Sequence, residues 1–293
     1  MVVDTYTLSV IILTKNEEVN LPVCLKSIDR LHCKVLIVDS GSEDSTVQIA
    51  KDAGLEVIEH HFDNYSSQRN WAQQKLPKGS QWVLHLDADE RLTPKLVDEI
   101  NQIIANPPGD IDGFMLRKRT HFMGRWIKHG GHYPSYHLRL FRRDKGFCED
   151  RLYDQHFIVN GKTDRLKNDY IDVVMSNLHE WTVRHARWAI LEALESNPGK
   201  VSANRVHANF WGNPIERRRW LREGLYLKAP LFLRAMLYWG YRYFLRLGFL
   251  DGKEGLIFHF LQGFWSRFLI DSTIYESRKQ QRKSETKPHN VHQ

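Results

Sequence analysis

Short apolar runs and amphipathic segments alternate along the first third of the chain. Four runs rich in β-branched residues have the continuous hydrophobicity of strands that are buried on both faces of a parallel sheet. These runs span residues 8–13, 34–39, 55–60 and 81–87. Segments with helical periodicity follow the runs, at residues 16–31, 44–54, 66–76 and 93–109. The alternation predicts a doubly wound, mostly parallel α/β sheet with right-handed crossovers.

Local signals indicate where these helices begin and end. Gly54 closes the second helical segment, and Pro77 follows the third. Thr93 and Pro94 open the fourth, where threonine suits the N-cap and proline suits the first helical turn. The fourth helix is therefore expected to begin directly after the acidic stretch that ends the fourth strand.

Acidic residues stand at the ends of two predicted strands. Asp39 closes the second strand, and Asp87 closes the fourth, with Asp89 and Glu90 close behind it. The carboxyl ends of parallel strands meet at one edge of a sheet, which is where ligands bind. Neighbouring carboxylates repel one another, and burial raises that cost unless a cation or hydrogen-bond donors compensate. Asp87 and Asp89 are expected to point to one side of the chain and to hold Mg²⁺ or Mn²⁺.

The loop after the second strand is suited to a polar ligand. Gly41 supplies flexibility and Ser40 and Ser42 supply hydroxyl groups, while Asp39 can accept hydrogen bonds from a ribose or a base. The chain contains no glycine-rich phosphate loop of the two common types. Nucleotide phosphates would therefore be neutralised by a metal ion, and not by a helix N-terminus.

Four ordered motifs carry a family resemblance. The stretches "SVIILTKNEEVNLPVCLKSI", "VLIVDSGSEDSTVQIAKDAG", "SSQRNWA" and "WVLHLDADE" resemble the N-terminal half of family 2 glycosyltransferases, which have the GT-A fold. They are most similar to the bacterial branch of lipopolysaccharide core β-glucosyltransferases, and a looser likeness continues to "GFLDGKEGLIFHFLQGFW". The resemblance implies an inverting transfer of a sugar from a nucleotide-sugar donor, with UDP expected, to a cell-envelope glycan or glycolipid.

The resemblance also assigns roles to individual residues. The implied donor-binding residues are Thr14, Asn16, Glu17, Asp39, Ser40, Arg69, Asp87 and Ala88. Asp87 and Asp89 correspond to the Asp-x-Asp motif that holds the divalent cation on the sugar diphosphate, and His179 is a further candidate ligand. For Arg69 and His179 the alternatives are an exposed arginine on a helix and a histidine that caps or packs against a helix.

An inverting transfer needs a base that deprotonates the acceptor hydroxyl. The resemblance favours Asp150 as this base, with Glu149 orienting it. Asp154 is a rival, because the lipopolysaccharide branch often carries His-Glu where this chain has Asp154 and Gln155. Each of these acids could also be an ordinary surface carboxylate.

A segment rich in glycine, histidine and tryptophan follows the first half of the chain. It spans residues 122–143 and reads "FMGRWIKHGGHYPSYHLRLFRR". Aromatic side chains between glycines suit a mobile loop that stacks on a sugar and closes over the donor, although an ordinary long loop would look similar.

Composition narrows the class and the compartment. The chain has 293 residues, of which 42% are hydrophobic and 26% charged, as in a globular protein with one large domain and an extension. Its three cysteines form no C-x-x-C pair, which argues against a disulfide framework or a zinc knuckle and favours a reducing cytosol. The first residues lack the basic, apolar pattern of a signal peptide. We therefore expect a cytoplasmic protein.

The C-terminal part combines positive charge with apolar and aromatic residues. From Arg205 onward there are 16 Lys and Arg against 7 Asp and Glu. Arg234, Arg242 and Arg246 share one helical face within the apolar stretch 221–250, and three arginines there would be costly in a helix that spans a membrane. This stretch and residues 255–270 are expected to lie in the headgroup region of an anionic membrane, on its inner face. The alternative is an amphipathic pair packed on the catalytic domain.

These patterns predict three regions. Residues 1–204 would form the GT-A catalytic domain, with a nucleotide-sugar half at 1–110 and an acceptor half at 111–204. Residues 205–276 would form amphipathic, membrane-associating helices, and the polar tail 277–293 would be disordered.

Two other classes of protein remain to be compared with this one. A sugar-phosphate nucleotidyltransferase would need a glycine-rich, basic loop where "LTKNEEVN" follows the first strand. A nucleic-acid-binding protein would need exposed basic helices or stacking platforms, and not long apolar stretches, so no nucleic-acid partner is expected. The sugar, the acceptor, the choice of base and the oligomeric state are left open by the sequence.

Overall fold

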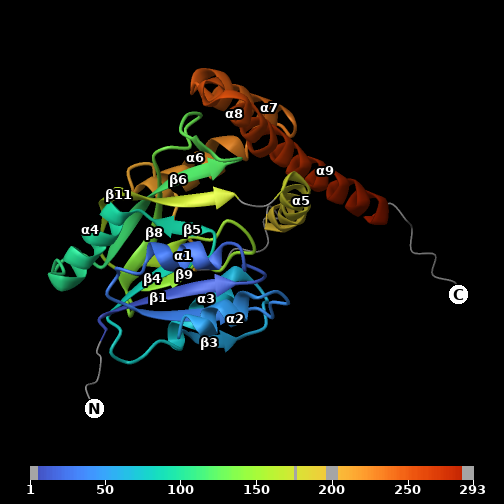
Figure 1. The fold of residues 1–293 in the computed structure, drawn as a ribbon. Helices are drawn as coiled ribbons and strands as arrows, with labels where there is room; N and C mark the ends of the chain where they lie inside the picture. Colours follow the sequence, from blue (N-terminus) through green and yellow to red (C-terminus); the bar gives the residue numbers. More distant parts are fainter. Residues whose placement is uncertain (1–5, 175–176, 196–203, 286–293) are drawn as a thin grey trace, which may run out of the picture.

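A mixed sheet forms the centre of the molecule (Figure 1). The computed structural model describes residues 6–174, 177–195 and 204–285. Within this part of the chain the sheet has the strand order β3-β2-β1-β4-β8-β6-β11-β5, with β7 paired to β6. Its strands are β1 (Leu8–Thr14), β2 (Lys34–Asp39), β3 (Glu56–Glu59), β4 (Trp82–Asp87), β5 (Glu90–Leu92), β6 (Gly113–Phe122), β7 (Arg125–Ile127), β8 (Ser135–Arg142) and β11 (Thr163–Val174). A separate hairpin pairs β9 (Gly146–Cys148) with β10 (Phe157–Val159).

The first half of the sheet has the predicted β-α alternation. Strands β1 to β4 are parallel to one another. The helices that connect or follow them are α1 (Leu21–Ser27), α2 (Thr46–Asp52), α3 (Tyr65–Gln74) and α4 (Pro94–Ala105). Thr93 is the N-cap of α4 and accepts a hydrogen bond from the backbone N–H of Leu96, as the Thr-Pro signal predicts. The predicted α/β fold class is confirmed.

The register of the parallel strands brings distant acidic residues to one edge. Asp39 at the end of β2 lies opposite Thr14, and Asp87 at the end of β4 lies opposite Leu13. Both faces of β1 and β4 are covered, so Val10, Ile12 and Leu84 are completely buried. The strands are therefore continuous apolar runs, and polar side chains appear only where the strands end.

The second half of the sheet is mainly antiparallel. Strand β8 pairs antiparallel with both β4 and β6, and β11 pairs parallel with β6. The three-residue strand β5 pairs antiparallel with β11, which places Glu90 opposite Asp172. Strand β11 thereby brings Asp172 to the edge where β4 ends.

Helical segments from the C-terminal part pack against the far end of this sheet (Figure 1). They are α5 (Leu178–Glu195), α6 (Pro214–Leu221), η1 (Arg222–Tyr226), α7 (Leu233–Gly240), η2 (Tyr241–Leu245), η3 (Gly248–Asp251), α8 (Gly252–Phe258), η4 (His259–Trp265) and α9 (Ser266–Glu285). Phe258 packs with Phe122 and Ile127 of the sheet, and Ile270 and Ile274 of α9 pack on α5. Among the described helices, none combines the length and the apolar composition needed to cross a membrane.

Two expectations about these segments need correction. The tail predicted to be disordered from residue 277 is helical as far as Glu285, because α9 continues through residues with high helix propensity. Residues 286–293 of that tail, like residues 196–203 beside the predicted boundary at 204, lie outside the described residues. The stretch 221–250 is also not one helix but is divided among η1, α7, η2 and η3.

The segment predicted to be a mobile loop over the donor is held by the C-terminal part instead. Residues 122, 125–127 and 135–142 belong to strands, and hydrogen bonds tie the stretch between β7 and β8 to residues 242–251. The backbone N–H of Gly130 donates to the carbonyl of Arg246, and His129 is bonded to Asp251 at 2.6 Å. Gly130 has φ +66°, and a Cβ there would lie 2.1 Å from the His259 ring. The glycine is needed for close packing between two parts of the chain.

Candidate active site

The Asp-x-Asp motif forms the turn between β4 and β5. Asp87 is the last residue of β4, Ala88 and Asp89 make the turn, and Glu90 begins β5. The Glu90 carboxylate accepts a hydrogen bond of 2.9 Å from the backbone N–H of Asp87. The motif is therefore held at both ends by sheet pairing and across the turn by one side chain.

Two arginines neutralise Asp87. Arg69 of α3 donates to its carboxylate at 3.0 Å, and Arg139 of β8 donates at 2.9 Å and also pairs with Glu90. Burial acts to raise the pKa of Asp87, but the two guanidinium groups outweigh it and hold this pKa below its usual range. Asp87 is thus ionised and fixed in orientation before any ligand arrives.

Asp89 has no such compensation. Its carboxylate makes no hydrogen bond to any residue in the described part of the chain, and burial together with Asp172 and Asp87 raises its pKa well above the usual value. Burial also raises the pKa of Glu90 to about 7, although Arg139 acts in the opposite direction. Ionisation of Asp89 is therefore unfavourable in the protein alone, and a bound cation would relieve that cost.

The donor set fits a hard divalent cation. Asp87 and Asp89 offer carboxylate oxygens, which Mg²⁺ and Mn²⁺ prefer. Over the described residues, no group of three His, Cys, Asp or Glu side chains is arranged to hold a metal ion. Oxygens of a bound phosphate would have to complete the shell, as is usual for Mg²⁺ in phosphate-handling sites. His179 is exposed near the start of α5 with no hydrogen bond to a described residue, so its role as a ligand stays a prediction.

Asp39 organises the loop after β2. It is 1% exposed and accepts hydrogen bonds from the Thr14 hydroxyl, from the Ser42 hydroxyl and from the backbone N–H groups of Gly41 and Ser42. Four donors therefore occupy a carboxylate that the resemblance assigns to the uracil or ribose. The geometry shows Asp39 holding the loop in shape, while its direct contact with a nucleotide stays a prediction. Ser40, beside it, is tied by its N–H to the carbonyl of Thr14.

Asn16 and Glu17 continue this rim. Asn16 has φ +55°, and its backbone N–H donates to the Ser42 hydroxyl at 2.9 Å. Glu17 accepts from Asn20 at 2.8 Å, and burial raises the pKa of Glu17, to which Asp87 and Asp44 add. The predicted donor-binding residues from β1, β2, α3 and β4 thus gather at one edge of the sheet.

Glu149 lies in a buried network of polar contacts. Its carboxylate is completely buried and accepts from Arg219 at 2.7 Å, from the backbone N–H of Val206 at 3.0 Å and from the backbone N–H of His156 at 2.9 Å. A carboxylate enclosed in this way cannot itself reach an acceptor hydroxyl, while its predicted role of orienting Asp150 stays a prediction. The residue fastens the segment after β9 to α6, because a buried carboxylate with charged and backbone donors is strongly stabilised in place.

Asp150 and Asp154 remain as candidates for the base. Asp150 is exposed, its carboxylate makes no hydrogen bond to a described residue, and its backbone N–H donates to the carbonyl of Asn204 at 3.1 Å. Asp154 is also exposed and has φ +55°, and the charges of His156 and Arg222 outweigh desolvation and lower its pKa. A lowered pKa makes a weaker base, which counts against Asp154.

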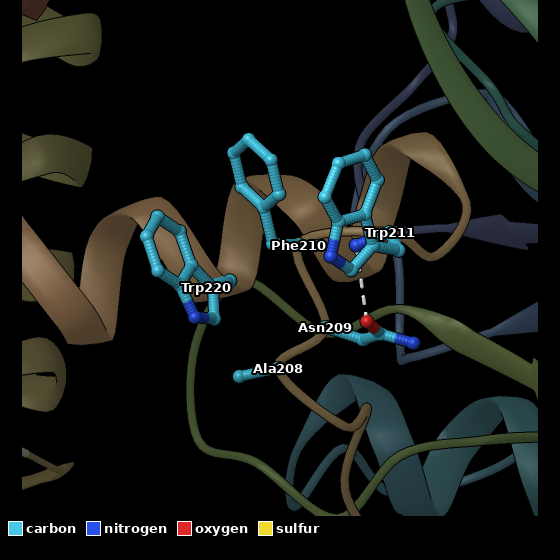
Figure 2. A pocket seen from close by; sticks show the side chains of 5 residues that line it. All are labelled: Ala208, Asn209, Phe210, Trp211 and Trp220. Atoms are coloured by element: carbon cyan, nitrogen blue, oxygen red, sulfur yellow. Dashed lines mark hydrogen bonds between the residues drawn. The ribbon is translucent and has the colours of Figure 1, made fainter.

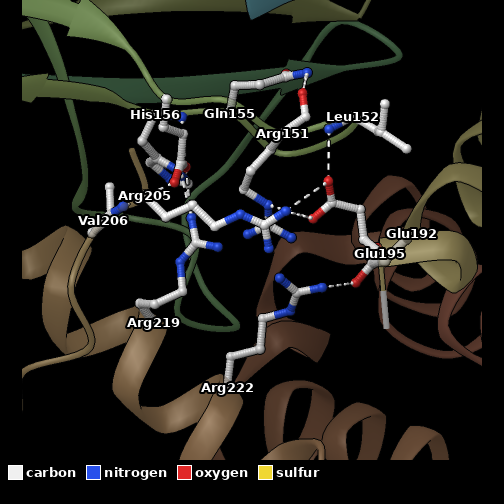
Figure 3. A network of polar contacts seen from close by, with 11 residues as sticks. Arg151, Leu152, Gln155, His156, Glu192, Glu195, Arg205, Val206, Arg219 and Arg222 are labelled. Carbon is white, nitrogen blue, oxygen red and sulfur yellow. Dashed lines mark hydrogen bonds and ion pairs between the residues drawn. The ribbon is translucent and has the colours of Figure 1, made fainter. Parts of the chain in front are cut away.

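The ion-pair network in Figure 3 joins this segment to two helices. Arg151 donates to Glu195 of α5 at 3.1 Å, and Arg222, at the start of η1, pairs with Glu192 of α5. Both glutamates and the Arg151 side chain are at most 5% exposed. The segment that carries Asp150 is therefore held by ion pairs to α5 on one side and to α6 on the other.

Sequence reasoning missed the residues that come from the second half of the sheet. Arg139 lies in a basic stretch of β8, 52 residues from Asp87 and 49 from Glu90, and Asp172 lies further along the chain in β11. Arg184 of α5 is a third such residue, since its charge acts against the burial that raises the pKa of Glu17. No local pattern marks these residues, because each becomes part of the site only through strand pairing or helix docking.

Comparison with known proteins identifies the class. The model of glycosyl transferase family 2 matches residues 9–159, which is more than half of the chain. The chain is a glycosyltransferase and belongs to family 2, as the motifs predict. This assignment argues against the nucleotidyltransferase and nucleic-acid-binding alternatives.

Individual relatives agree with the family. An uncharacterized glycosyltransferase of Rickettsia conorii is 26% identical over 286 residues, covering 93% of this chain and 91% of the relative. The lipopolysaccharide core biosynthesis glycosyltransferase LpsC of Rhizobium meliloti is 31% identical over 144 residues, covering 47% of this chain and 52% of the relative. The crystal structure of S. aureus TarS in complex with UDP-GlcNAc is 15% identical with a TM-score of 0.47, covering 93% of this chain and 92% of that chain.

Proposed function

We propose that this glycosyltransferase is a metal-dependent, inverting enzyme that takes a sugar from a UDP-sugar and builds a cell-envelope glycan at the cytoplasmic face of the membrane. One observation carries the metal-dependent part. Asp89 is uncompensated at the edge of the sheet, directly beside an Asp87 that two arginines keep ionised. Such a pair is poised for a divalent cation that brings a diphosphate with it.

Each residue of the site has a part in this reaction. A cation bound by Asp87 and Asp89 would stabilise the negative charge that grows on the nucleoside diphosphate as the sugar leaves. Arg69, fixed by Asp87, adds positive charge on the same side of the site. Asp150, exposed and unbonded, would accept the proton of the acceptor hydroxyl as that oxygen attacks the anomeric carbon.

The acceptor class is supported by one relative. LpsC is named for lipopolysaccharide core biosynthesis, and its likeness covers 47% of this chain. A glycan that is built on a lipid anchor requires an enzyme that works at a membrane surface. The C-terminal part of the molecule is consistent with that requirement.

The polarity of the C-terminal helices supports contact with a bilayer. Arg234 is 4% exposed and paired with Asp271, and Arg242 is 8% exposed and donates to the carbonyl of Gly130. The apolar side chains of the same segments face solvent. We call this set the apolar surface: Leu233, Met236, Leu237, Phe244, Leu245, Leu247, Phe249, Leu250, Leu256 and Phe260. This many exposed large apolar side chains on neighbouring segments would be buried if the helices lay in the headgroup region of a membrane.

Basic residues flank the apolar surface. Lys228, Arg246 and Lys253 are exposed on the same group of segments. Positive charges beside an apolar insertion would attract the anionic headgroups of the inner leaflet. The combination favours lipid as the partner of this surface.

The proposal is tested by donor turnover and product analysis. The purified enzyme would be offered a panel of UDP-, GDP- and TDP-sugars with Mn²⁺ or Mg²⁺, and nucleotide release would be measured with and without EDTA. We expect release from a UDP-sugar that EDTA abolishes and that added Mn²⁺ restores. NMR of the transferred product should show inversion at the anomeric carbon. Turnover that is insensitive to chelator would contradict the metal assignment, and a retained anomeric configuration would contradict the inverting mechanism.

A further inference from the structure

A cup lined by aromatic side chains lies outside the donor site (Figure 2). It has a volume of about 430 Å³ and is lined by Ala208, Asn209, Phe210, Trp211 and Trp220. Trp211 is 88% exposed, more than any other large apolar side chain among the described residues. An indole left in water forfeits the burial that normally stabilises a fold, so its exposure needs a reason.

The turn that presents Trp211 is firmly built. The Asn209 side chain accepts a hydrogen bond from the backbone N–H of Trp211 at 3.0 Å. Asn213 and Glu216 form a complete capping box at the start of α6. A Cβ on Gly212 would lie 1.8 Å from the Glu216 carboxylate, so only glycine fits between them. The exposure of Trp211 is therefore imposed by the turn and is not a result of a loose chain.

The rings of Phe210, Trp211 and Trp220 pack edge to face and are not stacked on one another. Phe210 lies between Trp211 and Trp220, meeting the first edge-on at 5.1 Å between ring centroids and the second at 4.9 Å (Figure 2). Edge-on packing fixes the rings without stacking them face to face. The high exposure of Trp211 leaves its ring available to a ligand.

The cup is connected to the segment that carries the candidate base. Arg219, the neighbour of Trp220 in α6, donates to Glu149, and the backbone N–H of Val206 donates to the same carboxylate. The backbone N–H of Asp150 bonds to Asn204, four residues before Ala208. The chain from Asn204 to Trp220 is thus anchored on one side to the Glu149–Asp150 pair and carries the cup on the other.

We propose that this cup binds a pyranose ring of the acceptor glycan next to the sugar that is modified. A pyranose has an apolar face of C–H groups and a rim of hydroxyls, which suits an aromatic wall beside an exposed amide such as Asn209. The connection to Asp150 places the cup on the acceptor side of the site and not on the donor side. The inference rests on the proposed function, because it presumes a glycan acceptor.

The experiment compares glycan binding by the full-length enzyme and two variants of one residue. A panel of delipidated lipopolysaccharide core oligosaccharides would be titrated in a calorimeter into the wild type, Trp211→Ala and Trp211→Phe. We expect at least one oligosaccharide to bind the wild type, about tenfold weaker binding to Trp211→Ala, and substantial recovery in Trp211→Phe, which keeps an aromatic ring. Circular dichroism and thermal melting would confirm that both variants are folded.

Control measurements separate this proposal from its rival and from the proposed function. Leu245→Ala, which changes the apolar surface, should bind the oligosaccharide as the wild type does. Trp211→Ala should bind anionic vesicles that contain no glycan as well as the wild type does. If Trp211→Ala loses vesicle binding and keeps oligosaccharide binding, the cup is a lipid anchor and the proposal is wrong. The proposal is also wrong if no oligosaccharide binds in a Trp211-dependent way while the wild type still releases UDP from a UDP-sugar. Loss of that UDP release alone would instead refute the proposed function.

Discussion

The two ends of this molecule distribute polar and apolar side chains in opposite ways. In the parallel half of the sheet the interior is apolar, and charge appears only at the edge where the strands end, as with Asp39 and Asp87. In the helices after residue 213, the buried positions include Arg234, Arg242 and Asp271, while leucines and phenylalanines face outward. The first arrangement is that of a protein in water. The second is the arrangement that the proposed contact with lipid would explain.

Each region leaves one kind of group in an environment that is unfavourable for it. Uncompensated charge in the first region lies at Asp89, where a cation and a diphosphate are expected to bind. Uncovered apolar area in the second lies along α7 to α8, where lipid is expected to bind. In each region the group that is unfavourable in isolation marks the place where the partner would compensate it.

The largest expected effect is at the edge of the sheet. Asp89→Asn should lower turnover by a factor of about 10² to 10³, because the charge that would hold the cation is lost. Stability should stay equal or rise at neutral pH, because the raised pKa of Asp89 shows that folding disfavours its ionised form. Nucleotide release and thermal melting would measure the two effects. Asp98→Asn, which affects an exposed ion pair, is the control and should change neither.

The second effect concerns the buried charge among the C-terminal helices. Asp271→Ala should destabilise the protein by about 3–5 kcal/mol, because it leaves Arg234 buried without its partner. Urea unfolding would measure the loss. Asp98→Ala is the control, because it breaks an ion pair with Arg30 in which both side chains are exposed. A loss of stability above about 1 kcal/mol in Asp98→Ala would contradict the expected difference between a buried and an exposed ion pair.

The third effect concerns the outward apolar side chains. Leu245 is 75% exposed, so Leu245→Asp should leave thermal stability unchanged within the error of the measurement. Co-sedimentation with anionic vesicles should weaken about tenfold, because the change removes apolar area and adds a negative charge. Val23→Asp, at an exposed apolar position of α1, is the matched control. Equal binding by both variants would show that the apolar surface does not contact lipid.

The smallest effect, counted per residue and per pH unit, is a loss of stability in acid. Burial lowers the pKa of His185 to about 4, and the pKa values of His85, His132 and His137 are also well below their usual range. The unfolded chain therefore binds more protons than the folded protein below pH 6.5, and stability should fall as the pH is lowered from there toward 4. Each such histidine adds at most about 1.4 kcal/mol per pH unit.

Urea unfolding at several pH values between 7.5 and 5 would measure this slope. His185→Gln should reduce the slope by the contribution of one proton. An unchanged slope would mean that His185 does not remain neutral in the folded protein over this range.

Much of the parallel half of the sheet could be predicted because its signals are local. Apolar runs, the Thr93 cap and the position of Asp87 at the end of a run all lie within a few residues of the structure that they specify. The acidic character of the turn was also readable, since Asp87, Asp89 and Glu90 are neighbours in the chain. Their compensation was not, because Arg139 and Asp172 arrive from strands that pair much later in the sequence.

The candidate base shows the same limit. Glu149 and Asp150 are adjacent, and although the resemblance favours Asp150 as the base, no local pattern says which of the two is buried. Arg219, 70 residues away, and the backbone of Val206 enclose Glu149 and leave Asp150 in solvent. Burial of a single side chain depends on which distant segment docks beside it, and no local pattern records that event.

What the sequence by itself determined is the order of strands and helices in the first third and the acidic turn after β4, because these depend on periodicity and on near neighbours. The predicted common face of Arg234, Arg242 and Arg246 is wrong for Arg246, which is exposed while the other two are buried. Only the tertiary structure decided this, because Asp271 binds Arg234 and the carbonyl of Gly130 accepts from Arg242, while leucines of the same segments face outward. The physical reason is that a buried guanidinium must meet its carboxylate or carbonyl partner wherever the fold places it, while apolar side chains take the surface that remains.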